Sequence, residues 1–225
     1  MTISLVARST DGGFGLAITS SSPAVAARCL YVEPGVGACA SQNITDPRLG
    51  TSVLALMRAG RSAPAAVDEV MSRPENAPAS PYRQVTAVGL DGQAAAFSGA
   101  SALGISGHRI EEGVVIGGNM LASLGVLDAG VEAFLDATGD LEARLLAGLQ
   151  AAVAAGGEMG PVHSAGLLVV GEPAWPITNL RVDWSEAPTD ELGSLWDLWR
   201  PQRDTYVLRA YNPAESPSYG VPGDE

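Results

Sequence analysis

Strand-like and helix-like segments come in blocks along this 225-residue chain rather than in strict alternation. Periodicity and turn signals predict three strands, two helices, three strands, two helices, two strands and one helix. Runs of strands followed by runs of helices favour antiparallel sheets with helices packed outside over alternating βαβ units. Two such blocks predict two sheets face to face, with a helical layer on each outer side. We therefore expect an α+β fold, a four-layer αββα sandwich.

The first predicted strand opens the chain, and its two faces differ in polarity. Ile3, Leu5 and Ala7 alternate with a second face that carries the hydroxyls of Thr2 and Ser4. Two hydroxyl side chains on one face are unusual for a strand at a chain end. We expect this strand to lie at the centre of the fold, with any chemistry beside it.

Turn and capping residues set the boundaries of the other elements. Asp46, followed by proline, is a typical start for a helix over residues 49–59, and Ser62 is a typical cap for the next helix. Thr189 is expected to cap the last helix. We also expect one strand over residues 108–116, ending in two glycines and Asn119.

The end of the chain differs in composition from the rest. From residue 213 it is acidic and rich in proline, serine and glycine, which is typical of a poorly ordered tail. We expect a single domain over residues 1–212 and a flexible tail over residues 213–225.

Composition excludes several classes of function. The formal net charge of −12 would repel a phosphate backbone, so we expect no nucleic-acid partner. All 13 basic residues are arginines, which excludes a lysine base, a Schiff base and a P-loop lysine. The two cysteines and two histidines show no metal-ligand spacing, so we expect no metal and no other cofactor. No leader precedes the first strand and no apolar run reaches the roughly 18 residues of a membrane span, so we expect a cytoplasmic protein without membrane contact.

Seven short motifs follow one another along the chain in one order. They are Thr2–Arg8, Gly15–Ser20, Gly35–Ala38 with Ser41 and Gln42, Asp46–Gly50, Arg83–Val85, Gly107–Arg109 and Gly118–Leu121. Together they resemble the bacterial and archaeal family called domain of unknown function 1028, over about residues 1–185. The resemblance implies the αββα sandwich of the N-terminal nucleophile (Ntn) hydrolases and carries no settled reaction. Many relatives have a lysine in the loop after the second strand, where this chain has Ser21 and Ser22.

The resemblance implies that Thr2 is the nucleophile. In Ntn hydrolases the side chain of the first residue attacks a carbonyl carbon while the free α-amine, with a pKa of about 7.7–8.0, takes the proton. Thr2 gains a free amine only when Met1 is removed, and Met followed by a small residue is usually a removable start. The alternative is a strand-end hydroxyl that a neighbour satisfies. Ser4 would line the same pocket or serve as a small core residue.

Two ionisable side chains are further candidates. Arg8 shares the face of Thr2, and a buried guanidinium needs an anion. It would bind a substrate carboxylate or pair with Asp11 or Asp183. His108 lies in one of the seven motifs and is the better site candidate of the two histidines, the alternative being a surface or internally satisfied histidine.

Polar side chains at strand ends complete the set of candidates. Ser41 and Gln42 close a predicted strand at the same end of the sheet as Thr2. Such groups could donate to an oxyanion or read a substrate amide, although residues that simply cap a strand end have the same composition. Asn119 follows two glycines, where a ligand can approach the backbone and hydrogen-bond to the amide; a plain strand-to-helix turn would use the same residues.

These candidates favour a hydrolase of small-molecule amides or cyclic amides, acting on C–N bonds, with Thr2, Ser4 and His108 as catalytic residues. In a variant that works without a free terminus, the fold would supply an oxyanion pocket for direct attack by water. The alternative is a ligand-binding or assembly protein that keeps the fold without catalysis. We also expect a homodimer, for which a helix face with Trp196 and Trp199 is the candidate contact.

Overall fold

The computed structural model describes residues 2–223, which form ten strands in two antiparallel sheets together with seven α-helices. One sheet contains β1 (Thr2–Arg8), β2 (Phe14–Ser20), β7 (Ile105–Glu111), β8 (Val114–Leu121), β9 (Ser164–Val170) and β10 (Pro176–Val182), in the order β10-β9-β2-β1-β8-β7. The other contains β3 (Leu30–Glu33), β4 (Gly37–Asn43), β5 (Arg83–Gly89) and β6 (Ala94–Ser98), in that order.

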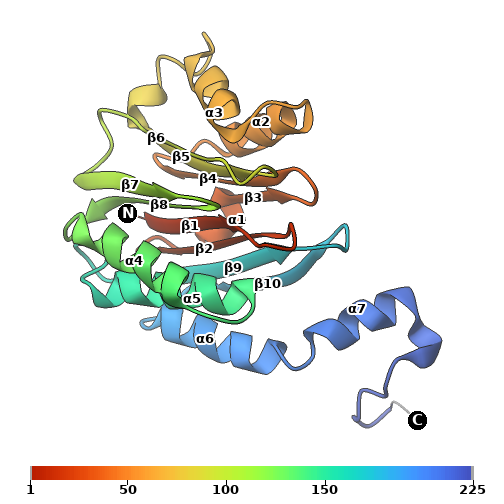
Figure 1. The fold of residues 1–225 in the computed structure, drawn as a ribbon. Helices are drawn as coiled ribbons and strands as arrows, with labels where there is room; N and C mark the ends of the chain where they lie inside the picture. Colours follow the sequence, from red (N-terminus) through yellow and green to blue (C-terminus); the bar gives the residue numbers. More distant parts are fainter. Residues whose placement is uncertain (1, 224–225) are drawn as a thin grey trace.

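Helices cover the outer faces of the two sheets (Figure 1). The helices of the chain are α1 (Ala26–Cys29), α2 (Pro47–Arg58), α3 (Ala63–Ser72), α4 (Gly125–Asp136), α5 (Leu141–Ala154), α6 (Pro188–Trp199) and α7 (Arg203–Tyr211). Of these, α1 contacts β4 and β9, one strand from each sheet, and α7 projects away from the sheets. Helices α2 and α3 pack on the four-stranded sheet, and α4, α5 and α6 pack on the six-stranded sheet. The two sheets face each other between these helical layers.

Three buried apolar clusters fill the spaces between these layers. Leu5 and Leu145 belong to the cluster between the six-stranded sheet and its helices. Val6 and Val88 belong to the cluster between the two sheets, and Val67 to the cluster under α2 and α3. Small aliphatic side chains predominate in all three, as expected for a chain in which only 5% of residues are aromatic.

Strand β1 lies inside the six-stranded sheet, between β2 and β8, as the sequence predicted. Ile3 and Leu5 point to the helical side, whereas Val6 points into the space between the sheets. Because side chains alternate along a strand, Thr2 and Ser4 share the face of Val6. The polar face of β1 is therefore directed at the four-stranded sheet.

Two of the three predicted helix caps are confirmed. The Asp46 carboxylate accepts a hydrogen bond from the Arg48 amide at the start of α2, and the Ser62 hydroxyl accepts one from the Ala65 amide at the start of α3. The prediction that Thr189 caps the last helix is wrong. A helix capped by Thr189 would begin at Asp190, whereas α6 begins at Pro188, because proline is preorganised for the first helical position.

The single strand predicted over residues 108–116 is also wrong. The chain turns at Gly113, whose φ is +73°, and β7 returns as β8 with Arg109 opposite Ile116. The turn is very short, and Ile110 before it and Val114–Ile116 after it read as parts of one strand, which concealed the hairpin. Strand β3 was not predicted, because four residues at a sheet edge show too little periodicity.

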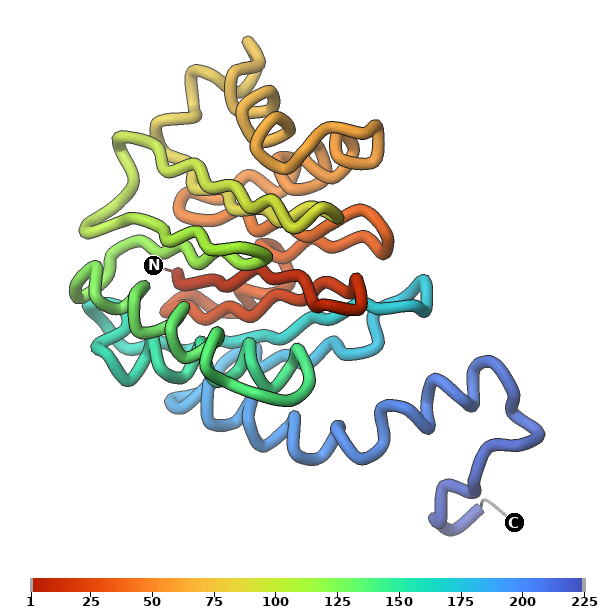
Figure 2. Tube along the Cα trace, viewed as in Figure 1, coloured from red at the N-terminus to blue at the C-terminus, as the bar shows by residue number. Residues whose placement is uncertain are grey.

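The chain after β10 leaves the body of the molecule. Helix α6 lies against the six-stranded sheet, and α7 projects beyond it (Figures 1 and 2). Trp196 is buried in the core, and the Trp199 indole N–H donates to the Ile177 carbonyl and the Thr178 hydroxyl. The tryptophan face proposed as a dimer contact therefore points inward, which corrects that assignment. Among residues 2–223, no helix has both the length and the apolarity needed to cross a bilayer.

Residues after α7 fold back onto it. The Arg209 side chain lies over the rings of Tyr206 and Tyr219, and it donates to the carbonyls of Pro217 and Ser218. These contacts tie the segment that begins at residue 213 to α7. The predicted domain boundary stays a prediction.

Candidate functional site

The Thr2 end of β1 collects polar side chains from several strands. Thr2 is only 5% exposed and pairs with Asn119 of β8. Its hydroxyl donates to the Ser20 hydroxyl at the end of β2, across 3.4 Å, and its carbonyl accepts from the Asn119 amide, across 3.5 Å. The structure thus brings Thr2 and Asn119, both predicted site residues, into contact.

A chain of hydroxyls extends from Thr2 into the loop after β2. The Ser20 and Ser22 hydroxyls lie 2.9 Å apart, and the Ser22 amide also donates to Ser20 Oγ. Arg28, on α1, donates from Nη2 to Ser22 Oγ across 2.6 Å. Ser20, Ser22 and Arg28 were not predicted as site residues.

Three buried amide side chains meet between the sheets, beside Thr2. Gln42 and Asn119 both donate to Gln84 Oε1, at 2.8 and 3.2 Å. Gln84 in turn donates to the carbonyls of Gly107 and Gly118. Sequence reasoning missed Gln84, although its position in a motif and within an otherwise apolar strand was an available signal.

The orientation of these amides leaves acceptor oxygens free to bind a ligand. Each amide NH2 donates to a backbone carbonyl, which can only accept, so the amide groups cannot be flipped without losing that bond. Within residues 2–223, Gln42 Oε1, Asn119 Oδ1 and Ser4 Oγ are buried and have no hydrogen-bond partner. Buried polar atoms normally have partners, and an N–H or O–H donor of an internal water or of a bound molecule would supply one here.

His108 lies at the edge of this amide cluster. It pairs with Gly117, which pairs with Ser4 on its other side, so the three residues form one row across β7, β8 and β1. Its Nδ1 lies 3.4 Å from the hydroxyl of Ser98, which also accepts from Gln84. Burial and the neighbouring Arg109 lower the pKa of His108, so the ring is neutral near pH 7. His108 reaches Thr2 only through other residues of the cluster.

Ser41 and Arg8 lie apart from Thr2. The Ser41 hydroxyl donates to the Asp46 carbonyl, because Ser41 faces α2 while its neighbour Gln42 faces the sheet interface. Arg8 lies six residues further along β1, about 20 Å from Thr2 at the usual rise of a strand. Asp11 has its pKa lowered mainly by the Ser9 hydroxyl, and the charge of Arg8 adds to that shift.

Glu158 is a buried acid that sequence reasoning missed. It bridges to Leu121 at the end of β8, and its Oε2 accepts from the Ser21 amide across 3.3 Å. Oε1 is buried without a partner within the described residues. Burial raises the pKa of Glu158 to about 7, so the carboxyl can gain or lose a proton near neutral pH. A single glutamate between a helix and a strand gives no sequence signal.

Backbone strain is concentrated at the same end of the molecule. Among residues 2–223, the non-glycine residues with positive φ are Ala24, Asn43 and Met120, at 51°, 72° and 52°. Asn43 follows Gln42, Met120 follows Asn119, and Ala24 lies in the loop after β2. Such conformations cost on the order of 1 kcal/mol each and cluster at functional sites.

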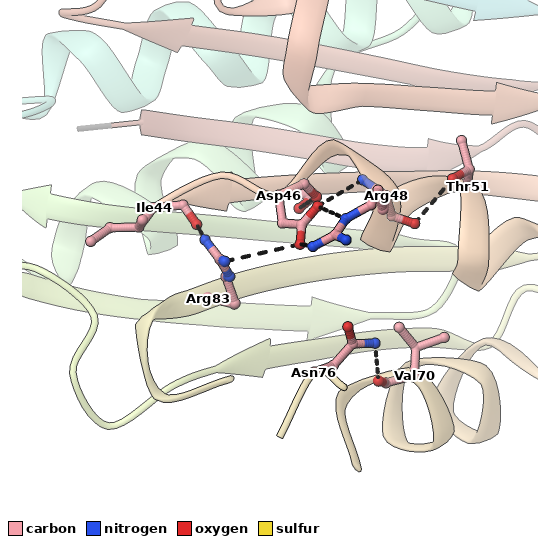
Figure 3. Close-up of polar contacts among 8 residues, drawn as sticks. Ile44, Asp46, Arg48, Thr51, Val70, Asn76 and Arg83 are labelled. Carbon is pink, nitrogen blue, oxygen red and sulfur yellow. Dashed lines mark hydrogen bonds and ion pairs between the residues drawn. The ribbon is translucent and has the colours of Figure 1, made fainter. Parts of the chain in front are cut away.

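The Asp46–Gly50 motif holds the loop after Gln42 in place (Figure 3). The Asp46 carboxylate accepts from Arg48 Nε and Nη2 at 2.9 and 2.7 Å, and Arg83 lies 4.0 Å from the same carboxylate. Arg83 also donates to the Ile44 carbonyl. The Arg48 hydrogen bond lowers the pKa of Asp46, which stays ionised as a helix cap. This motif has a structural role beside the site.

The opposite end of the six-stranded sheet contains a cavity of about 420 Å³, lined by Asp11, Glu142, Arg203 and neighbouring residues. Its position at the β1–β2 turn separates it from Thr2 by the length of β1. No group of three or more His, Cys, Asp and Glu side chains in the described part of the chain could hold a metal ion.

The fold and this site define a two-sheet α+β protein whose central strand begins at a buried threonine. A family model described as "Family of unknown function (DUF1028)" matches residues 2–192, and the chain belongs to this family. A crystal structure of a DUF1028 protein from Silicibacter pomeroyi has 33% sequence identity and a TM-score of 0.80, over 88% of this chain and 85% of that chain. The family membership predicted from the seven motifs is confirmed.

A second solved structure is Anbu, an ancestral β-subunit from Yersinia bercovieri. It has 11% sequence identity and a TM-score of 0.34, over 97% of this chain and 100% of that chain. No curated protein matches the chain.

Proposed function

We propose that the protein is an Ntn-type hydrolase of small-molecule amides or cyclic amides, built as a four-layer αββα sandwich. The position of Thr2 carries the proposal. It lies at one end of the central strand, its hydroxyl and carbonyl are both held by neighbours, and Asn119, whose Oδ1 is buried without a partner within the described residues, contacts it. The two facing sheets with helices on their outer faces support the sandwich architecture.

The reaction would use the Thr2 hydroxyl and the α-amine that removal of Met1 creates. Thr2 Oγ1 attacks the amide carbon and its proton passes to the α-amine. When the tetrahedral intermediate collapses, the C–N bond breaks and the leaving nitrogen takes that proton. Water then hydrolyses the Thr2 ester. The amide oxygens of Gln42 and Asn119 would accept N–H groups of the substrate, and His108 would act at the edge of this pocket.

Covalent labelling with a β-lactone tests whether Thr2 is a nucleophile, and it requires no knowledge of the substrate. Attack by Thr2 Oγ1 breaks the acyl C–O bond of the ring, forms an ester, and leaves a proton on the ring oxygen, so the intact mass rises by the whole mass of the lactone. We expect protein from its native host to begin at Thr2 and to be labelled once, at Thr2. Thr2→Ala should abolish labelling, Thr2→Ser should retain it, and Thr51→Ala, at an exposed position of α2, should match the wild type.

Two results would contradict the covalent mechanism: retention of Met1 in every molecule, or equal labelling of the Thr2→Ala variant. The first result would favour the variant in which water attacks directly. If both results were found and an N–H-rich small molecule bound tightly, the protein would be a ligand-binding protein instead. The unpaired amide oxygens support this second candidate.

A further inference from the structure

A positively charged side chain from α1 contacts the loop after β2. The chain contains no lysine, so any side-chain cation near Thr2 other than histidine must be an arginine. Arg28 projects from α1 into this loop, where Nη1 donates to the Pro23 carbonyl across 2.5 Å and Nη2 donates to Ser22 Oγ across 2.6 Å. Arg28 therefore contacts the loop with both ends of its guanidinium group.

The charge of Arg28 is not neutralised by a carboxylate. Within residues 2–223, no Asp or Glu oxygen lies within 4 Å of its guanidinium nitrogens, whereas eleven arginine–carboxylate contacts involve Arg48, Arg58 and other arginines. Arg28 is also half-buried. A partly desolvated cation favours nearby negative charge, and the groups it contacts lead to Thr2.

The contacts form an unbroken path from Arg28 to the hydroxyl of Thr2. Ser22 Oγ lies 2.9 Å from Ser20 Oγ, and Ser20 Oγ lies 3.4 Å from Thr2 Oγ1. Hydroxyl hydrogens rotate freely, so each serine can either accept from or donate to its neighbour. When Thr2 Oγ1 loses its proton, Arg28 can donate to Ser22, Ser22 to Ser20, and Ser20 to the Thr2 alkoxide. All donors then point one way, and hydrogen bonds in such a chain strengthen one another.

We propose that Arg28 is a positioning residue that stabilises negative charge on Thr2 Oγ1 through Ser22 and Ser20. This inference rests on the proposed role of Thr2 as nucleophile and adds the group that activates it. Arg28 does not touch the reacting atoms. Its contribution passes through two hydroxyls, so it should be smaller than that of a direct oxyanion donor, which is worth roughly 10²–10³ in rate.

The rate of β-lactone labelling at Thr2, measured against pH, tests the proposal. Arg28→Gln should label about tenfold more slowly at pH 7 than the wild type, and its pH profile should shift to higher pH, because a nearby cation favours both the neutral α-amine and the alkoxide. Arg28→Lys should recover most of the rate. Arg58→Gln is the matched control, since Arg58 is exposed and pairs with Glu33 on the surface; its rate and profile should equal those of the wild type.

A double-mutant cycle tests the path. Ser22→Ala should slow labelling as much as Arg28→Gln does, and the double variant should lose no more, because both changes interrupt the same chain. If Arg28→Gln does not fold, the labelling rate of Ser22→Ala tests the same path. An unlabelled wild type, or a Thr2→Ala variant labelled equally, would overturn the proposed function and this inference with it. Labelling at Thr2 with a wild-type rate and profile in Arg28→Gln and Ser22→Ala would overturn the role of Arg28 alone.

Discussion

Glu142 and Glu158 are both buried, but the structure treats them differently. Glu142, on α5, is 2% exposed and accepts from the Thr178 hydroxyl at 2.7 Å and from Arg203 Nη1 at 3.2 Å. Glu158 is 5% exposed and accepts from one backbone amide, while its other oxygen has no partner within the described residues. Two carboxyl groups of similar burial therefore differ in state. Glu142 forms a structural ion pair at one end of the molecule, and Glu158 has a raised pKa at the other.

The difference separates two uses of a buried charge. A buried carboxylate with a guanidinium and a hydroxyl as partners holds elements together, here α5, β10 and the start of α7. Burial raises the pKa of a carboxyl that has no guanidinium partner, as it does for Glu158, and groups with such shifts are concentrated at functional sites. The contrast supports the assignment of the Thr2 end as the site and of the Arg203 end as an anchor.

Removal of Arg203 should have the largest effect, because it leaves Glu142 charged and buried without its cation. We expect Arg203→Ala to lower the free energy of unfolding by about 3–5 kcal/mol. Urea unfolding monitored by tryptophan fluorescence measures the change. Arg200→Ala, which removes an exposed arginine 3.6 Å from Asp140, should cost less than about 1 kcal/mol. Equal costs for the two variants would show that the Glu142–Arg203 pair is not an anchor.

Glu158→Gln should change the pH dependence of stability. Folding raises the pKa of Glu158 from 4.5 to about 7. The stabilising contribution of the protonated carboxyl is therefore fully present below pH 4.5 and is lost as the pH rises through 7. A pKa shift of this size corresponds to about 3 kcal/mol of unfolding free energy. The wild type loses this stability as the pH rises from 4.5 through 7, and the glutamine variant does not.

The comparison of unfolding free energies at pH 4.5 and pH 8 checks this expectation, since all other groups contribute equally to both proteins. Glu186→Gln is the control, because its side chain is exposed, and it should keep the slope of the wild type. Parallel slopes for wild type and Glu158→Gln would mean that Glu158 is ionised at neutral pH in the folded protein.

Thr178→Val should have the smallest effect of the three. Valine has nearly the shape of threonine but removes the donor to Glu142 and one acceptor of the Trp199 indole, which keeps the Ile177 carbonyl. Because Arg203 still pairs with Glu142, we expect a loss of about 1–2 kcal/mol. Thr51→Val on exposed α2 should change stability by less than about 0.5 kcal/mol. A loss as large as that of Arg203→Ala would make the hydroxyl, rather than the ion pair, the main support of Glu142.

Local patterns predicted much of the fold. The alternation of Ile3 and Leu5 with Thr2 and Ser4 identified the two faces of β1, because the period of a strand depends only on neighbouring residues. The Asp46 and Ser62 caps were predictable for the same reason. The hairpin of β7 and β8 was not, since its turn has no strong composition signal.

The candidate site was predictable only in part. Thr2 contacts Asn119, and Gln42 joins Asn119 through Gln84 Oε1, whereas simple strand geometry places Ser41 on the opposite face from Gln42 and Arg8 far from Thr2. The separation of both residues from Thr2 therefore follows from strand geometry alone.

The sequence by itself determined the family, the central strand and the polar face that this strand presents, because these depend on motifs and on side-chain alternation. Tertiary structure alone decided which groups gather at the Thr2 end of the molecule. Gln84, Glu158 and Arg28 come from three separate segments, and no local pattern encodes the distance from a carboxylate or guanidinium to a hydroxyl on another strand. The same long-range packing made Glu142 a paired charge and left Glu158 able to change its protonation state.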